Sequence, residues 1–91
     1  MTAKVTITAG INAKIGFNYS AWRIGLTHDL AERKNYWSAT KGQDVSRWSA
    51  WTADSLPDAQ SIETYFLSEK KMRRGEGGEL APGKPIYVYV F

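Results

Sequence analysis

The sequence predicts an α+β fold in which a small mixed sheet of three to four strands is flanked by two helices, in the order β-β-α-β-α-β. Residues 86–91 are apolar or aromatic at every position, and a strand that is apolar on both faces usually lies inside a sheet. Two segments combine a capping signal with apolar residues at helical spacing, which predicts helices at residues 29–40 and from residue 55. With 91 residues, the whole chain, 1–91, is expected to form one domain.

Three further strands are expected along the chain. Residues 4–8 are rich in β-branched side chains, and residues 20–26 alternate large apolar side chains with others, so both segments suit a pleated surface. A hairpin is the simplest connection between these two strands. A strand at residues 45–53 would place Trp48 and Trp51 on opposite faces, so at most one of them joins the main core. The other is a candidate for a partner surface.

The helices are predicted from their ends. Asp29 is expected to be an N-cap, with Glu32 completing a capping box, and Gly42 is expected to lie beyond the end of that helix. Ser55 is expected to begin the second helix, with a proline in its first turn. The buried stripe of the second helix is expected to contain Ala59, Ile62, Phe66 and Leu67.

Basic residues crowd the expected last turn of the second helix, where cations suit the helix dipole. These residues are Lys70, Lys71, Arg73 and Arg74. They could follow a phosphate backbone, or they could serve only as the C-terminal end of a helix. The glycines at positions 75, 77 and 78 are expected to end the helix in a loop, which lacks the residues of a nucleotide-binding P-loop.

Composition restricts the classes of function. The chain has no cysteine, which excludes a disulfide framework and a thiolate metal site. Its single histidine, His28, cannot supply a histidine-rich zinc site, so an ion held by oxygens, such as Mg²⁺, is the metal that remains. A net charge of +3 and a pI near 9.3 modestly favour a polyanionic partner. The chain has no apolar run long enough to span a membrane and no signal-peptide pattern, so a cytoplasmic protein is expected.

Two charged residues on the expected helices could perform chemistry. Arg33 could grip a phosphate with its planar guanidinium, or it could cover Trp37 with its stem and pair with an acid such as Asp29. Glu63 flanks the buried stripe and could hold one Mg²⁺, or it could be a solvated helix residue. His28 could act as a general base, or it could be an exposed loop residue.

The segment Arg23-Ile24-Gly25-Leu26-Thr27-His28-Asp29 is followed by Arg33, eight positions after the glycine. With this segment, residues 20–67 resemble the GIY-YIG nuclease superfamily, whose pattern is Tyr-Ile-Gly-x-Thr-x-Asp followed by an arginine at the same spacing. The segment Ala59-Gln60-Ser61-Ile62-Glu63 is similar to the family's alanine-to-glutamate segment. The resemblance implies that Arg33 and Glu63 are catalytic, that Glu63 binds Mg²⁺ if the chain is active, and that the substrate is nucleic acid.

The chain departs from the family at the motif tyrosines. Arg23 occupies the position of the YIG tyrosine, and neither Ala9-Gly10-Ile11 nor Ile15-Gly16-Phe17 matches the first motif. Spacing selects neither Tyr19 nor Tyr36 as a replacement. These departures favour binding over cleavage.

Two functions are therefore expected to compete. The first is nucleic-acid binding, with DNA the expected form and with Mg²⁺-dependent endonuclease activity as its stronger version. Its backbone contacts would come from Arg23, Lys70, Lys71, Arg73 and Arg74. The second is a small non-enzymatic protein-interaction module, such as a phage or mobile element encodes, that uses exposed tryptophan and tyrosine. The first would place Arg33 and Glu63 within about 10 Å of each other across an open groove.

Overall fold

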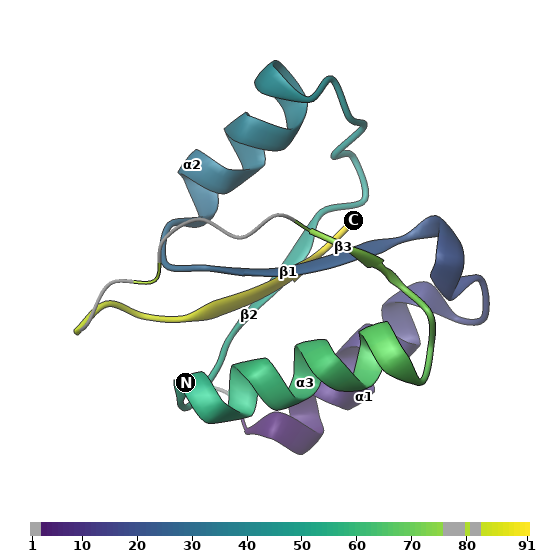
Figure 1. The fold of residues 1–91 in the computed structure, drawn as a ribbon, viewed down its shortest axis with the longest axis vertical. Helices are drawn as coiled ribbons and strands as arrows, with labels where there is room; N and C mark the ends of the chain where they lie inside the picture. The colour runs from purple at the N-terminus through teal and green to yellow at the C-terminus, as the bar shows by residue number, and fades with distance from the viewer. Residues whose placement is uncertain (1–2, 76–79, 81–82) are drawn as a thin grey trace.

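The computed structural model describes residues 3–75, 80 and 83–91. It is an α+β domain with a four-stranded mixed sheet, as the sequence predicts (Figure 1). The elements are α1 (Lys4–Ile15), η1 (Tyr19–Ala21), β1 (Arg23–Thr27), α2 (Leu30–Asn35), η2 (Tyr36–Thr40), β2 (Ser49–Thr52), α3 (Leu56–Ser68), β3 (Arg73–Arg74) and β4 (Tyr87–Val90). Most of the expected glycine loop, at 76–79, and Pro82 lie outside the described residues.

The last strand in the sequence lies inside the sheet. The strand order is β2-β4-β1-β3, and β4 runs antiparallel to both of its neighbours. Strand β3 is parallel to β1. Strands β1, β2 and β3 therefore all run in one direction, and only β4 runs against them. The interior position predicted for residues 86–91 is confirmed.

Helices cover both faces of the sheet. Helices α1 and α3 pack on one face, while α2 lies on the other (Figure 1). Strand β4 contributes Val88 and Val90 to the core under α1 and α3, and Tyr89 to the core under α2. Trp48 stacks on Tyr89, whereas Trp51 packs against the opposite core. The two tryptophans lie on opposite faces as predicted, but both are half-buried and packed.

The first expected strand is wrong, because residues 4–8 belong to helix α1. Ile7, Ile11 and Ile15 are spaced four residues apart and are all buried, so they form one face of a helix. This face packs in the same core as α3. Burial of the three isoleucines outweighs the strand propensity of the β-branched residues around Ile7. The expected hairpin at the N-terminus is therefore absent from the described residues, and a helix opens the element order.

Both predicted helix starts are confirmed. The carboxylate of Asp29 accepts a hydrogen bond from the backbone N–H of Glu32 at 3.1 Å. The hydroxyl of Ser55 accepts one from the N–H of Asp58 at 3.3 Å. Helix α2 continues into the π-helical segment η2, and Gly42 follows with φ of +64°, a conformation that favours glycine.

The second helix ends earlier than its basic residues suggested. Helix α3 ends at Ser68, and the chain turns at Lys71, whose φ is +60°. The side chain of Met72 is buried in the core, and its N–H donates to the carbonyl of Phe66 at 3.1 Å. Burial of Met72 brings the chain back to the sheet, where Arg73 and Arg74 form β3 beside β1. The expectation that all four basic residues occupy a helical last turn is wrong.

The ring of Tyr89 ties the sheet to α2 and η2. Tyr89 is fully buried, and its hydroxyl accepts a hydrogen bond from the indole N–H of Trp37 at 3.0 Å. On the neighbouring strand, Tyr89 lies opposite Gly25. A Cβ atom at Gly25 would lie 2.4 Å from the phenolic oxygen, so only glycine leaves room for this ring.

No helix in the described part of the chain has the length and apolar character needed to cross a membrane.

We expect Gly25→Ala to lower the free energy of unfolding by about 1–3 kcal/mol, because the buried Tyr89 ring has to shift. Gly10→Ala is the control: its Cβ would meet the half-buried Trp51 ring at 2.9 Å, and alanine favours the helix. Urea denaturation of both variants measures the difference. Unchanged stability in Gly25→Ala would contradict the close packing at Gly25.

Candidate functional site

Arg33 and Glu63 do not share a site. Arg33 lies on α2, where its side chain is buried and its guanidinium carbon lies 4.5 Å from the centroid of the Tyr36 ring. Glu63 lies on α3, across the sheet, with a carboxylate oxygen 4.0 Å from the guanidinium of Arg74. Because α2 and α3 cover opposite faces of the sheet (Figure 1), the expected groove between the two residues is absent. The expectation that Arg33 and Glu63 face each other across an open groove is wrong.

Glu63 is held in a partly buried environment. Burial raises the pKa of its carboxyl, and the positive charge of Arg74 offsets part of that rise. The resemblance to the nuclease superfamily implies Glu63 as a ligand of Mg²⁺. Within residues 3–75, 80 and 83–91, no group of three or more histidine, cysteine, aspartate or glutamate side chains is placed to hold a metal ion.

The sheet brings two of the predicted nucleic-acid-binding residues together. Arg23 at the start of β1 is the direct neighbour of Arg73 at the start of β3. Side chains alternate between the faces of a strand, so Arg74 turns to the α3 face and meets Glu63. Lys70 places its ammonium 5.2 Å from the centroid of the Tyr19 ring.

Three arginines meet at one end of the sheet. Because β1, β2 and β3 run in the same direction, their first residues lie at the same end, together with the last residue of β4. Arg23 and Arg73 begin β1 and β3, and Arg47 lies two residues before β2. They line a cavity of about 130 Å³, which we call the arginine pocket. Its lining residues are Ala21, Arg23, Gln43, Asp44, Arg47, Arg73 and Phe91.

Two of these guanidinium groups are held by aromatic rings and backbone carbonyls. The guanidinium carbon of Arg23 lies 5.0 Å from the centroid of the Trp37 ring, and the guanidinium donates a hydrogen bond to the carbonyl of Arg74 at 3.1 Å. The guanidinium carbon of Arg47 lies 4.0 Å from the centroid of the Trp22 ring, and the guanidinium donates a hydrogen bond to the carbonyl of Ala21 at 3.2 Å. An arginine has five N–H donors, so these contacts fix the positions of the guanidinium groups and leave other donors for a ligand.

One carboxylate, Asp44, stands among the side chains that line the arginine pocket. Its oxygen accepts a hydrogen bond from the N–H of Ser46 at 2.9 Å. Hydrogen bonds from Ser46 lower the pKa of Asp44, and the charge of Arg47 lowers it further. Asp44 is therefore charged at neutral pH. Three guanidinium groups against one carboxylate leave the pocket with an excess of positive charge.

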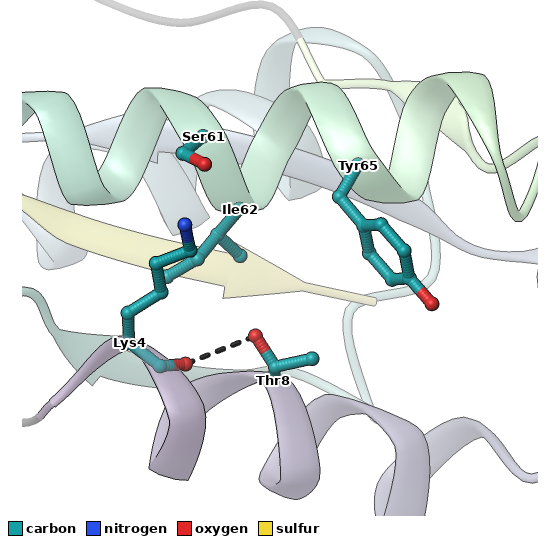
Figure 2. Close-up of a pocket in the computed structure, with 5 residues that line it drawn as sticks. All are labelled: Lys4, Thr8, Ser61, Ile62 and Tyr65. Atoms are coloured by element: carbon teal, nitrogen blue, oxygen red, sulfur yellow. Dashed lines mark hydrogen bonds between the residues drawn. The ribbon is translucent and has the colours of Figure 1, made fainter.

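A second cavity, of about 210 Å³, lies between α1 and α3 (Figure 2). It is lined by Lys4, Thr8, Ser61, Ile62 and Tyr65. The side chain of Lys4 extends from α1 towards α3 (Figure 2), and the hydroxyl of Thr8 donates to the backbone carbonyl of Lys4 at 2.9 Å. Its lining carries one cation, so it lacks the converging charges of the arginine pocket.

Arg47 was not predicted as a site residue. Each strand that starts at this end has an arginine at or just before its first residue, a repetition that becomes a signal only once the strand directions are known. His28 follows the opposite end of β1 and is not part of the arginine pocket.

Comparisons with protein-family models, curated proteins and solved structures give no match to the chain.

We expect the stability of the protein to depend on pH through Glu63. Because burial raises the pKa of its folded-state carboxyl above the ordinary value of 4.5, the folded protein binds the proton more tightly than the unfolded chain. The stabilisation from Glu63 is therefore full below pH 4.5 and is lost as the pH rises through the raised pKa. Glu63→Gln has no carboxyl to ionise and should gain stability relative to the wild type over this range.

Urea denaturation of both proteins from pH 4 to pH 7 measures this difference. Asp58→Asn, which changes a carboxyl elsewhere on α3, is the control. A relative loss of stability in Glu63→Gln as the pH rises would mean that the pairing with Arg74 outweighs burial.

Proposed function

We propose that the protein binds the phosphate backbone of nucleic acid and that the arginine pocket makes the principal contact. The observation that carries the proposal is the convergence of Arg23, Arg47 and Arg73 from three strand starts on one cavity. Guanidinium groups match the oxygens of a phosphate with paired, charge-assisted hydrogen bonds. A cavity of about 130 Å³ holds several water molecules and so has room for a phosphate group.

Neighbouring basic residues extend this surface. Lys70 and Lys71 lie three and two residues before β3, so they approach the end of the sheet at which Arg73 lies. Arg74 makes a different contribution, since Glu63 lies close enough to offset its charge. Contacts of this kind bind phosphate without reading the base sequence, so affinity should depend strongly on salt and weakly on sequence.

We keep the resemblance to the GIY-YIG superfamily as part of the proposal. Two arrangements support it: β1 passes through Gly25 and leads into the capped helix that carries Arg33, and an antiparallel strand with a tyrosine, Tyr89, lies beside Gly25. That strand is β4, from the far end of the sequence. Tyr89 is fully buried, and Arg33 and Glu63 lie on opposite faces of the sheet, so we propose binding rather than cleavage.

The protein-interaction alternative has less support. It rested on exposed aromatic residues, and both Trp48 and Trp51 pack against core residues. In the part of the chain that the structure describes, the large apolar side chains that are exposed are Val5, Phe17 and Tyr65. We therefore favour the nucleic-acid partner.

We expect Arg73→Gln to weaken binding to an oligonucleotide by about fivefold, on the order of 1 kcal/mol, because one charged phosphate contact is lost. The slope of log K against log salt should become less negative by about 1. The double variant Arg47→Gln/Arg73→Gln should lose about 2 from the slope. Fluorescence anisotropy with a labelled 20-nucleotide DNA, between 50 and 200 mM salt, measures both quantities.

Lys84→Gln is the matched control. It removes one positive charge near the start of β4, at the opposite end of the sheet from the arginine pocket. Its affinity and salt slope should stay close to those of the wild type. If Lys84→Gln and Arg73→Gln weaken binding equally, net charge rather than the pocket drives association, and the proposal fails.

A further inference from the structure

We infer that the nucleic acid held at the arginine pocket is single-stranded and that the ring of Phe17 stacks on one of its bases. This inference rests on the proposed function and adds the class of nucleic acid to it. It is carried by the exposure of Phe17, by its short separation in the chain from the pocket residue Ala21, and by the lysine–aromatic contact at Tyr19, between these two residues in the sequence.

Phe17 presents its ring to solvent on a fixed backbone. Its exposed fraction is 90%, the highest of the exposed large apolar residues among the described positions. Its N–H donates to the carbonyl of Ile15 at 3.1 Å, and the N–H of Gly16 donates to the carbonyl of Asn12 at 3.0 Å. The turn therefore holds the ring away from the core. Burial of a phenylalanine side chain stabilises a fold, and the exposed ring of Phe17 does not contribute in this way.

The chain places Phe17 beside the arginine pocket. Phe17 lies four residues before Ala21, which lines the pocket, so their Cα atoms are at most about 14 Å apart. Segment η1 lies between them, and a helical turn shortens that distance. The connection from α1 to η1 lies at the end of the sheet where β1 begins (Figure 1).

Tyr19, which lies in the chain between Phe17 and the pocket residue Ala21, carries a cation over its ring. The ammonium of Lys70 lies 5.2 Å from the centroid of the Tyr19 ring. Tyr19 itself packs inside the fold: its ring stacks on Phe66, and its hydroxyl donates a hydrogen bond to the side chain of Asn12 at 2.6 Å. The backbone of a bound strand could therefore pass the Lys70 ammonium on its way from the pocket to Phe17.

An exposed aromatic ring beside a cationic pocket favours single-stranded over double-stranded nucleic acid. In a duplex the faces of the bases stack on one another, so an aromatic ring reaches them only where base pairs are unstacked at a cost of free energy. A single strand offers a base face beside each phosphate, and proteins that bind single strands combine a cationic groove with aromatic side chains on which the bases stack. Phe17 and the arginine pocket supply these two components within a short stretch of surface.

The test compares binding of one labelled 12-nucleotide DNA, single-stranded and as a duplex of the same sequence, at fixed salt. The wild type should bind the single strand more tightly. Phe17→Ala should weaken single-strand binding about fivefold or more, because one base–aromatic contact is lost. It should leave the salt slope unchanged, because no charge is removed. Phe17→Trp, which keeps an aromatic ring, should retain the affinity.

Val5→Ala is the control, since Val5 is 75% exposed at the start of α1. It should bind as the wild type does, and thermal unfolding should show both alanine variants folded. If the wild type binds the duplex as tightly as the single strand, or if Phe17→Ala behaves as Val5→Ala does, the inference is overturned. An Arg73→Gln effect would then still uphold the proposed function. No binding of either form by the wild type would overturn both.

Discussion

The placement of β4 between β1 and β2 is the constraint on which the arginine pocket depends. Because β4 runs antiparallel to both neighbours, β1 and β2 must start at the same end of the sheet, and the parallel strand β3 starts there too. Close packing fixes this arrangement: the buried ring of Tyr89 fills the space over Gly25 and accepts the indole N–H of Trp37. The convergence of three arginines is therefore a consequence of how the core packs.

The arginines on the two faces of the sheet differ in their surroundings from the arginines at its end. Under α2, Arg33 is buried against Tyr36, and on the α3 face Arg74 lies beside Glu63. These arginines have partners within the fold. At the sheet end, contacts with Trp37 and Trp22 position Arg23 and Arg47 while leaving donors available. The proposed binding of phosphate uses these prepositioned donors and does not require the Arg33–Glu63 pair.

Local signals in the sequence were sufficient for part of the fold. The caps at Asp29 and Ser55 and the interior strand at residues 86–91 depend on near neighbours, and all were predicted. Helix α1 was missed because β-branched residues around Ile7 favour a strand locally, while burial against α3 decides the outcome. The arginine pocket could not be predicted because strand direction is set by pairing with β4, over 35 residues after Trp51 in the chain. For that reason Arg23 and Arg73 were proposed as contacts, but neither their adjacency nor the role of Arg47 was foreseen.

A titration of the full chain with inorganic phosphate, followed by the arginine Nε–Hε signals in ¹H–¹⁵N spectra, tests the central claim most directly. The account predicts that the signals of Arg23, Arg47 and Arg73 shift together along one saturating curve while that of Arg74 stays in place. Equal, unsaturated shifts of all four signals, or no shift of the first three, would contradict a phosphate site at the end of the sheet.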